Sequence, residues 1–351
     1  MITVVVDASG LAWGRGGIER YTRAVCRELL DAPQLRLVLV TNSRRPVLDL
    51  PGAHEVARRV KGGALWRATV LAGEARRWHA DVLWCPRPTV PLAPLPCPLV
   101  TTVHDVSPVL HRGTKPWRET LAMATAGRWA VRRADGVLAV SSQTADDLER
   151  TWSVPRDRVT VVPLAVDGSF VPADRAAAQQ AVQRRWGLEP PFGLAVGTIE
   201  PRKGYDLLVD VAQQLPELPL VIAGRVGPRS KALADQLGPT CTLLGGVTDE
   251  ELLALYRAAE VLLAPSLYEG FGLTPLEALA CGTPAVVAAA QVLSARPTQA
   301  PRSCRATPLR GSRRSGRRSG SVRAGSLSGR VRLVPVPGVM SRTRRQRSCW
   351  T

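Results

Sequence analysis

Short runs rich in Val, Ile and Leu alternate with helical patterns along the first 288 residues. Runs such as Val4–Val6 are apolar on both faces, which is typical of parallel strands covered by helices on both sides. The pattern predicts an α/β protein. Strands are expected at Thr3–Val6, Arg36–Val40, Val82–Cys85, Leu99–Val103, Val137–Val140, Val159–Val162, Gly193–Val196, Leu220–Ala223, Thr242–Leu244, Val261–Ala264 and Ala285–Ala288. Helices are expected at Ile18–Leu30, Pro116–Arg133, Tyr205–Gln214, Asp249–Ala258 and Pro275–Ala280.

The alternation breaks once, at residues 163–191, where prolines flank a stretch rich in Ala, Gln and Arg. We interpret this break as a connection between domains. It gives an N-terminal domain over 1–165, a connection over 166–191 and a C-terminal domain over 192–290. Both domains are predicted to be doubly wound sheets. Such sheets bind ligands beyond the carboxyl ends of their strands, here in a cleft between the domains.

The positive charge of the chain is concentrated at its end. The net charge is +18, of which residues 1–290 contribute +3 and residues 291–351 contribute +15, from 15 Arg and no acidic residue. The overall charge would favour a nucleic-acid binder, but it describes the tail and not the two domains. No nucleic-acid partner is therefore expected, apart from nonspecific binding by the basic tail.

From about Gln291 neither periodicity continues, and Arg, Ser, Gly and Pro dominate. The 74 residues after Glu277 carry no acid, although earlier usage predicts about seven. We interpret 291–351 as a disordered or out-of-frame tail, with a frameshift near 288–292 that leaves the second domain incomplete. Two alternatives stay open: a genuine tail that binds RNA or an anionic membrane, and a product without activity.

The cysteines and the start of the chain indicate a cytoplasmic protein. The seven cysteines form no C-x-x-C pair, the chain begins with a strand pattern, and no apolar run reaches 18 residues. A basic stretch from Arg58 to Trp78 includes Leu65 and Trp66, which leaves peripheral contact with the inner membrane face open. The alternative is an ordinary packed helix with a basic face.

A glycine-containing loop follows the predicted strand Val261–Ala264. Gly270, Phe271 and Gly272 allow a tight turn in which the backbone comes close to a ligand. Glu269 directly precedes this loop, where its carboxylate can point at that ligand. The simpler alternative is that both glycines only form a turn.

A helix start follows the loop. Pro275 suits the first helical position, Thr274 would be the N-cap, and Glu277 would complete a capping box. Free N–H groups at such a start favour an anion, for example a diphosphate. The simpler alternative is that Glu277 is only a capping residue.

Glu269 and Glu277 are separated by seven residues in E-G-F-G-L-T-P-L-E-A-L-A-C-G-T-P. This segment resembles the E-x7-E signature of family 4 glycosyltransferases, retaining enzymes of the GT-B fold with two Rossmann-like domains facing a cleft. The resemblance implies that Glu269 is a catalytic-site residue near the donor sugar and its leaving group. It implies that Glu277 holds the ribose of the nucleotide. The donor-binding assignment includes Gly270, Phe271, Gly272 and Thr274.

Two adjacent cations, Arg202 and Lys203, follow the predicted strand Gly193–Val196 in G-T-I-E-P-R-K-G. Arg offers a planar fork and Lys a point charge, which together can neutralise a pair of phosphates. An isolated Arg-Lys pair is more often a solvated turn. The segment resembles the family's G-T-x-E-P-R-K segment, which implies that both side chains contact the donor diphosphate.

A glycine-rich loop containing Gly16 and Gly17 lies between the first strand and the first helix. It does not match G-x-G-x-x-G, so a dinucleotide site is not favoured and a plain strand–helix turn stays open. The family has a similar loop there, which shapes the acceptor side and approaches the donor phosphates. The resemblance therefore adds Gly16 and Gly17 to the donor-binding residues.

His104 and Asp105 end the strand Leu99–Val103. Such a pair is more often structural, with a hydrogen bond that fixes the ring. In the family an H-D pair at this place lies at the cleft near the transferred sugar, so His104 becomes the second catalytic-site residue. The segment Ser141–Leu148 also resembles a family segment. Its own pattern predicts a strand followed by a Ser or Thr helix cap, and we assign it a structural role.

The resemblance implies transfer of a GDP- or UDP-linked sugar to a saccharide, lipid-linked or other acceptor, with retention of configuration. Polysaccharides, glycolipids or glycoconjugates are the expected products, and the transferred sugar is expected to be a hexosyl or mannosyl group. No metal and no other cofactor are expected, because basic side chains and a helix start carry the phosphate charge and no D-x-D motif is convincing. A nucleotide-sugar epimerase, which shares the fold but needs no acceptor, is the rival enzyme.

Overall fold

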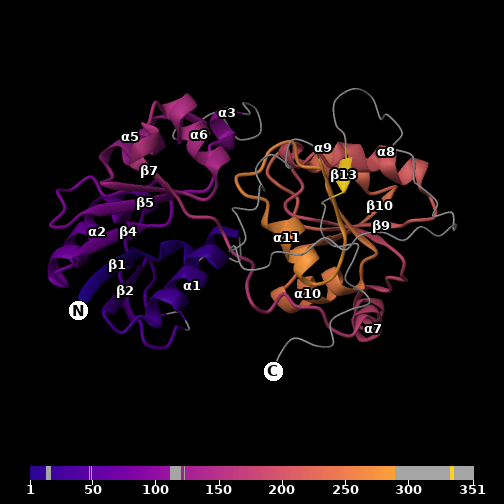
Figure 1. Ribbon diagram of the computed structural model, residues 1–351, viewed down its shortest axis with the longest axis horizontal. Coiled ribbons are helices and arrows are strands. Elements are labelled where there is room, and N and C mark those ends of the chain that lie inside the picture. The colour runs from indigo at the N-terminus through magenta and orange to yellow at the C-terminus, as the bar shows by residue number, and fades with distance from the viewer. Residues whose placement is uncertain are drawn as a thin grey trace, which may run out of the picture.

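The computed structural model describes residues 1–12, 17–46, 48, 50–110, 120–121, 123–288 and 333–335. They form two α/β lobes, each built around one sheet (Figure 1). Within the described residues, the first sheet has seven parallel strands in the order β3-β2-β1-β4-β5-β6-β7. Their bounds are β1 Ile2–Asp7, β2 Leu35–Thr41, β3 His54–Ala57, β4 Val82–Cys85, β5 Leu99–Val103, β6 Gly136–Ala139 and β7 Val159–Val161.

Helices cover both faces of the first sheet. They are α1 Gly17–Leu30, α2 Gly63–Arg77, α3 Ser107–Leu110, α5 Arg128–Arg133 and α6 Ser142–Trp152, with short helical turns at Ser9–Ala12, Met123–Gly127 and Arg156–Arg158. The helix predicted over Pro116–Arg133 is regular only from Arg128 and follows a wider turn, while residues 111–119 and 122 lie outside the described residues. The Ser cap predicted for α6 is confirmed, because the Ser141 side chain accepts the N–H of Thr144.

The second lobe repeats this plan. Its described strands are ordered β10-β9-β8-β11-β12-β13, with bounds β8 Gly193–Val196, β9 Leu220–Ala223, β10 Cys241–Gly245, β11 Val261–Ala264, β12 Ala285–Ala288 and β13 Leu333–Pro335. Its helices are α7 Arg175–Trp186, α8 Asp206–Gln214, α9 Lys231–Leu237, α10 Asp249–Ala258 and α11 Leu273–Ala280, with a turn at Pro201–Lys203. The first five strands are parallel, whereas β13 pairs antiparallel with β12.

Each sheet is buried on both faces, as the continuous apolar runs predicted. In the first lobe Val5, Leu83 and Trp152 belong to one core cluster, while Val6 and Leu39 belong to another. The alternation between Val5 and Val6 follows from the two-residue period of a strand. The second lobe also has two core clusters, one around Leu194, Tyr256 and Leu262 and one around Ala195, Tyr205 and Ile222.

The predicted connection 166–191 belongs largely to the second lobe. Helix α7 packs on α10, and Val182 is fully buried in the core around Leu194. Phe170 joins the same core, where its ring meets the edge of Tyr256. The chain therefore enters the second lobe before Phe170, and the helix of the connection is part of that lobe.

The predicted tail is described only at β13. Its register places Leu333, Val334 and Pro335 opposite Ala288, Val287 and Val286 of β12. Edge strands expose unpaired backbone groups, and this short pairing covers part of the β12 edge. Residues 289–332 and 336–351 lie outside the described residues, and with them all but the first residue of the proposed frameshift region 288–292 and the predicted disorder of the tail.

The order of the strands reverses direction at one place in each sheet. In the first sheet the chain runs from β1 outward through β2 and returns to the other side at β4; in the second the same happens between β8 and β11. Ligands in doubly wound sheets bind at the carboxyl ends of the strands beside this reversal. The candidate site residues follow these strands.

Candidate active site

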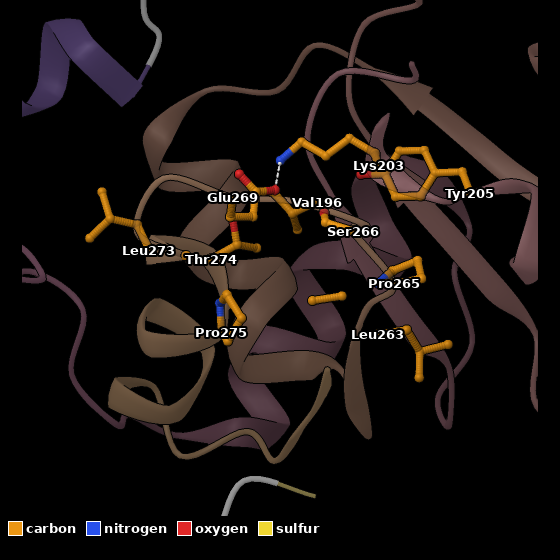
Figure 2. A pocket seen from close by; sticks show the side chains of 12 residues that line it. Val196, Lys203, Tyr205, Leu263, Pro265, Ser266, Glu269, Leu273, Thr274 and Pro275 are labelled. Carbon is orange, nitrogen blue, oxygen red and sulfur yellow. Dashed lines mark hydrogen bonds and ion pairs between the residues drawn. The ribbon is translucent and has the colours of Figure 1, made fainter. Parts of the chain in front are cut away.

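The structure brings three predicted site residues together at the reversal in the second sheet. Arg202 and Lys203 lie in the turn after β8, and Glu269 lies in the loop after β11. The Nζ of Lys203 is 2.5 Å from Oε1 of Glu269, and Nη1 of Arg202 is 3.3 Å from Oε2. Figure 2 shows the ammonium group of Lys203 reaching the carboxylate above the start of α11.

Charges in this cluster are balanced. Arg202 also donates from Nη2 to Oε1 of Glu200 at 2.7 Å, so two cations face two carboxylates. Burial raises the pKa of Glu269, but Lys203 and Arg202 outweigh that effect and hold it below its ordinary value. Burial opposes the charge of Arg202, yet Glu269 and Glu200 raise its pKa above the ordinary value. A polyanion at this place would compete with Glu269 for both cations.

The start of α11 differs from the prediction. The helix begins at Leu273, after Gly272 with φ of 87°, and no side chain caps it. Thr274 therefore lies inside the first turn and is not the N-cap, so the capping box predicted with Glu277 is wrong. The reason is that glycine adopts positive φ without steric cost, which lets the chain enter the helix two residues earlier.

Glu277 has another set of partners. Its buried carboxylate accepts from Nη1 of Arg20 at 2.9 Å and from the hydroxyl of Tyr256 at 2.8 Å. Arg20 lies on α1 of the first lobe, so this ion pair crosses between the lobes. The sequence did not single out Arg20, because nothing local to α1 indicates a partner 257 residues away.

A small cavity of about 30 Å³ separates the cluster from the first turn of α11 (Figure 2). Its walls include Lys203, Glu269, Gly272 and Thr274. This volume suits one or two water molecules and not a nucleotide sugar. A larger ligand therefore requires the Lys203 and Glu269 side chains to separate.

His104 lies at the end of β5, at the edge of the same region. Its Nε2 is 2.9 Å from the carbonyl oxygen of Pro86, which only accepts, so Nε2 carries the proton. The ring packs edge-on against Tyr21 with centroids 4.9 Å apart. Burial lowers the pKa of His104, so the imidazole is neutral at pH 7 and its Nδ1 is a base.

Gly270 brings the two lobes into contact. A Cβ atom on Gly270 would be 1.8 Å from the carbonyl oxygen of His104, so only glycine fits there. The hydroxyls of Ser141 and Thr144, at the start of α6, lie 2.5 and 3.2 Å from the carbonyl oxygen of Gly270. Gly270 therefore contacts residues of the first lobe. Phe271, the next residue, is partly buried.

A second contact lies one residue before Glu269. The hydroxyl of Tyr268 donates to Oδ2 of Asp147 at 2.6 Å, and Asp147 is fully buried on α6. The segment Ser141–Leu148, assigned a structural role from its cap alone, therefore also holds the Glu269 loop. The sequence offered no signal for this role, because the burial of Asp147 becomes visible only in the structure.

The glycine-rich loop of the first lobe is only partly described. Gly17 is exposed at the first residue of α1, and Gly16 lies outside the described residues. The described residues contain no group of three His, Cys, Asp or Glu side chains that could hold a metal ion.

The basic stretch from Arg58 to Trp78 follows β3 and contains helix α2. Trp66 and Leu71 are fully buried in the core of the first lobe, whereas Leu65 is exposed. The apolar side of α2 thus faces the sheet, as in the packed-helix alternative. Searched over the described residues, no helix has both the length and the apolar character to cross a membrane.

Comparison with known proteins agrees with this geometry. A family described as "Glycosyltransferase Family 4" matches residues 15–170, and one described as "Glycosyl transferases group 1" matches residues 178–294. A D-inositol 3-phosphate glycosyltransferase from Salinispora arenicola is 33% identical over 330 residues, covering 78% of this chain and 72% of that protein. The serotype-specific mannosyltransferase WbdA of Escherichia coli is 32% identical over 211 residues, covering 55% of this chain and 26% of that protein.

Similar solved structures share the arrangement of both lobes. Sucrose-phosphate synthase from Thermosynechococcus elongatus superposes with a TM-score of 0.65 at 20% identity, covering 84% of this chain and 82% of that one. Anabaena HepE in complex with UDP-glucose gives a TM-score of 0.63 at 17% identity, with the same coverage. The chain spans between a quarter and a half of the length of the first curated relatives it matches. With both lobes, the signature segment and a curated relative matched, the chain belongs to family 4 of the glycosyltransferases and has the GT-B fold.

Proposed function

We propose that this protein transfers a sugar from a nucleotide-sugar donor to an acceptor hydroxyl with retention of configuration. The observation that carries the proposal is the meeting of Arg202, Lys203 and Glu269 at the strand reversal of the second lobe. Ligands of doubly wound sheets bind there, and the cations match a diphosphate. Membership of the family supports the same reaction.

The leaving group of this reaction is a nucleoside diphosphate, whose charge must be stabilised as the glycosidic bond breaks. Arg202 and Lys203 take this role, together with the free N–H groups at the start of α11. Lys203 exchanges its contact with Glu269 for the more highly charged diphosphate. This exchange also opens the small cavity beside α11.

Glu277 binds the ribose hydroxyls in this proposal. Its carboxylate already accepts two hydrogen bonds, from Arg20 and Tyr256. The Arg20 side chain is partly exposed whereas Tyr256 is fully buried, so ribose hydroxyls displace the guanidinium more easily than the phenol. The nucleotide therefore breaks one of the contacts between the lobes as it binds.

Retention requires the acceptor to attack from the face that the diphosphate leaves. The anomeric carbon loses its bond to the diphosphate oxygen and gains one to the acceptor oxygen, through an ion-pair-like transition state. The acceptor proton passes to the departing diphosphate. In this proposal His104, which is neutral and directly follows β5, faces the transferred sugar from the first lobe.

The donor is a UDP- or GDP-linked hexose. A similar solved structure contains UDP-glucose, and a relative is named a mannosyltransferase. The acceptor is a saccharide, a lipid-linked or another hydroxyl-bearing molecule, and the reaction needs no bound metal ion. The enzyme works in the cytoplasm.

The test measures turnover of UDP-glucose and of GDP-mannose through the release of UDP or GDP. Each donor is incubated with and without a mixture of glycoside and inositol phosphate acceptors, in the presence of excess EDTA. We expect release of UDP or GDP that depends on an acceptor. In Lys203→Gln the rate of this release should fall about 100-fold. Lys231→Gln, which removes an exposed lysine at the start of α9, is the matched control. Conversion of a donor to its epimer without acceptor would instead identify an epimerase, and no reaction at all would contradict both.

A further inference from the structure

The two lobes meet through the start of α6 and the loop that carries Glu269. Tyr268, directly before Glu269, donates its hydroxyl to Asp147 of the first lobe at 2.6 Å. Gly270, directly after Glu269, accepts the hydroxyl of Ser141 at 2.5 Å through its carbonyl oxygen. Both neighbours of Glu269 in the chain are therefore fixed by the other lobe.

The same contact also fixes Arg202. The carbonyl oxygen of Tyr268 accepts Nη1 of Arg202 at 2.8 Å, and the same Nη1 lies 3.3 Å from Oε2 of Glu269. A shift of Tyr268 therefore moves the backbone that aligns the Arg202 guanidinium. The chain of contacts runs from Asp147 through Tyr268 to Arg202 and Glu269.

The burial of Asp147 is offset only in part by partners on its own helix. The Asp147 side chain is fully buried, whereas the side chain of the adjacent Asp146 is 64% exposed and lies 3.8 Å from Arg156. Gln143 and Arg150 on α6 share Oδ1 of Asp147, which leaves Oδ2 to Tyr268. A buried carboxylate is tolerated only where such partners satisfy it.

We propose that Asp147 is a positioning residue for sugar transfer, which acts by docking Tyr268 so that Glu269 and Arg202 are aligned when the lobes are closed. This inference rests on the proposed function. Arg202 and Glu277, which bind the donor in the proposed function, keep their contacts with Glu200 and Tyr256 when Tyr268 is released, so donor affinity in the absence of acceptor depends less on Asp147 than transfer does. Transfer depends on it, because transfer requires Glu269 to be held against the first lobe.

The test compares Tyr268→Phe and Asp147→Asn with Asp146→Asn as the matched control. Tyr268→Phe removes only the hydroxyl, and Asp147→Asn keeps the shape of the side chain. We expect kcat to fall about tenfold in Tyr268→Phe, with the Kd for the donor changed by less than about twofold. Asp146→Asn should match the wild type in both. The double variant should lose no more than the more severe single variant, because both remove one contact.

A second readout does not depend on activity. Amide hydrogen exchange in the peptide covering residues 266–272 should become faster in Tyr268→Phe and Asp147→Asn, and stay unchanged in Asp146→Asn. An unchanged kcat and unchanged exchange in Tyr268→Phe would overturn the proposal. A fall in the unfolding temperature large enough to account for the fall in kcat would also overturn the proposal, since it would indicate a merely structural role. If the wild type turns over no donor, the proposed function fails, and the positioning role falls with it; exchange then reports only whether the docking exists.

Discussion

Replacement of Gly270 by alanine should separate the two lobes without unfolding either. The added Cβ would lie 1.8 Å from the carbonyl oxygen of His104 and 3.0 Å from the Cβ of Asp105, where ordinary contacts begin at 3.4 Å. The nearest obstacle is backbone at the end of β5, which cannot rotate away. The loop must therefore retreat by about 1.5 Å, which breaks the hydrogen bonds from Ser141 and Thr144 to the Gly270 carbonyl.

A displacement of about 1 Å at a reacting group costs about 100-fold in rate, so kcat of Gly270→Ala should fall by about that factor. The assay is steady-state turnover of the preferred donor, together with thermal unfolding. Gly73→Ala is the control, because Gly73 lies exposed on α2 and, apart from its chain neighbours and the backbone of its own helix, no atom lies within 4 Å of its Cβ position. That change should leave kcat unaltered and stabilise the helix slightly. A Gly270→Ala protein with kcat within twofold of the wild type would refute the close approach of the lobes.

Three further outcomes are expected. Tyr256→Phe leaves Oε2 of the buried Glu277 without its phenol donor, so the free energy of unfolding measured with urea should fall by about 1–3 kcal/mol with an unchanged m-value. An unaltered urea midpoint would argue against this hydrogen bond. Burial lowers the pKa of His104, so below about pH 6.5 the unfolded chain binds a proton that the folded protein does not, and the free energy of unfolding falls as the pH decreases. His104→Gln should flatten this slope below about pH 6.5, and an equally steep slope would contradict the assignment. Proton NMR of the first product formed from an α-linked donor should show an α-linkage, and a β-linkage would exclude retention.

Much of the fold follows from local patterns. Strands such as β4, β8 and β11 have the predicted bounds, because each is an apolar run that is followed directly by Pro or Gly and is covered on both faces. Strand β3, His54–Ala57, was not predicted, because two of its four residues are polar and it lies at the sheet edge. Helix α9 was also missed, since seven residues give too little periodicity to recognise.

The central residues of the candidate site could also be predicted from the sequence. Arg202 and Lys203 follow β8, and Glu269 follows β11, and the parallel topology alone brings these two strand ends together. The start of α11 was misjudged, because the Thr274 and Pro275 cap signal competes with Gly272, whose positive φ starts the helix earlier.

The contacts between the lobes could not be predicted. The pairs Arg20–Glu277 and Asp147–Tyr268 join residues more than 100 positions apart, and they depend on how one folded lobe lies against the other. No periodicity or capping rule carries that information. The burial of Asp147, which indicates a partner outside its own helix, is visible only in the folded structure.

The most direct test of the donor site is a crystal structure of the protein with an unreactive analogue of its preferred nucleotide sugar. The account predicts diphosphate oxygens within about 3 Å of Arg202 and Lys203, with Lys203 moved off Glu269 and the ribose hydroxyls on Glu277. A nucleotide bound elsewhere, or bound here with the Lys203–Glu269 pair intact, would contradict it.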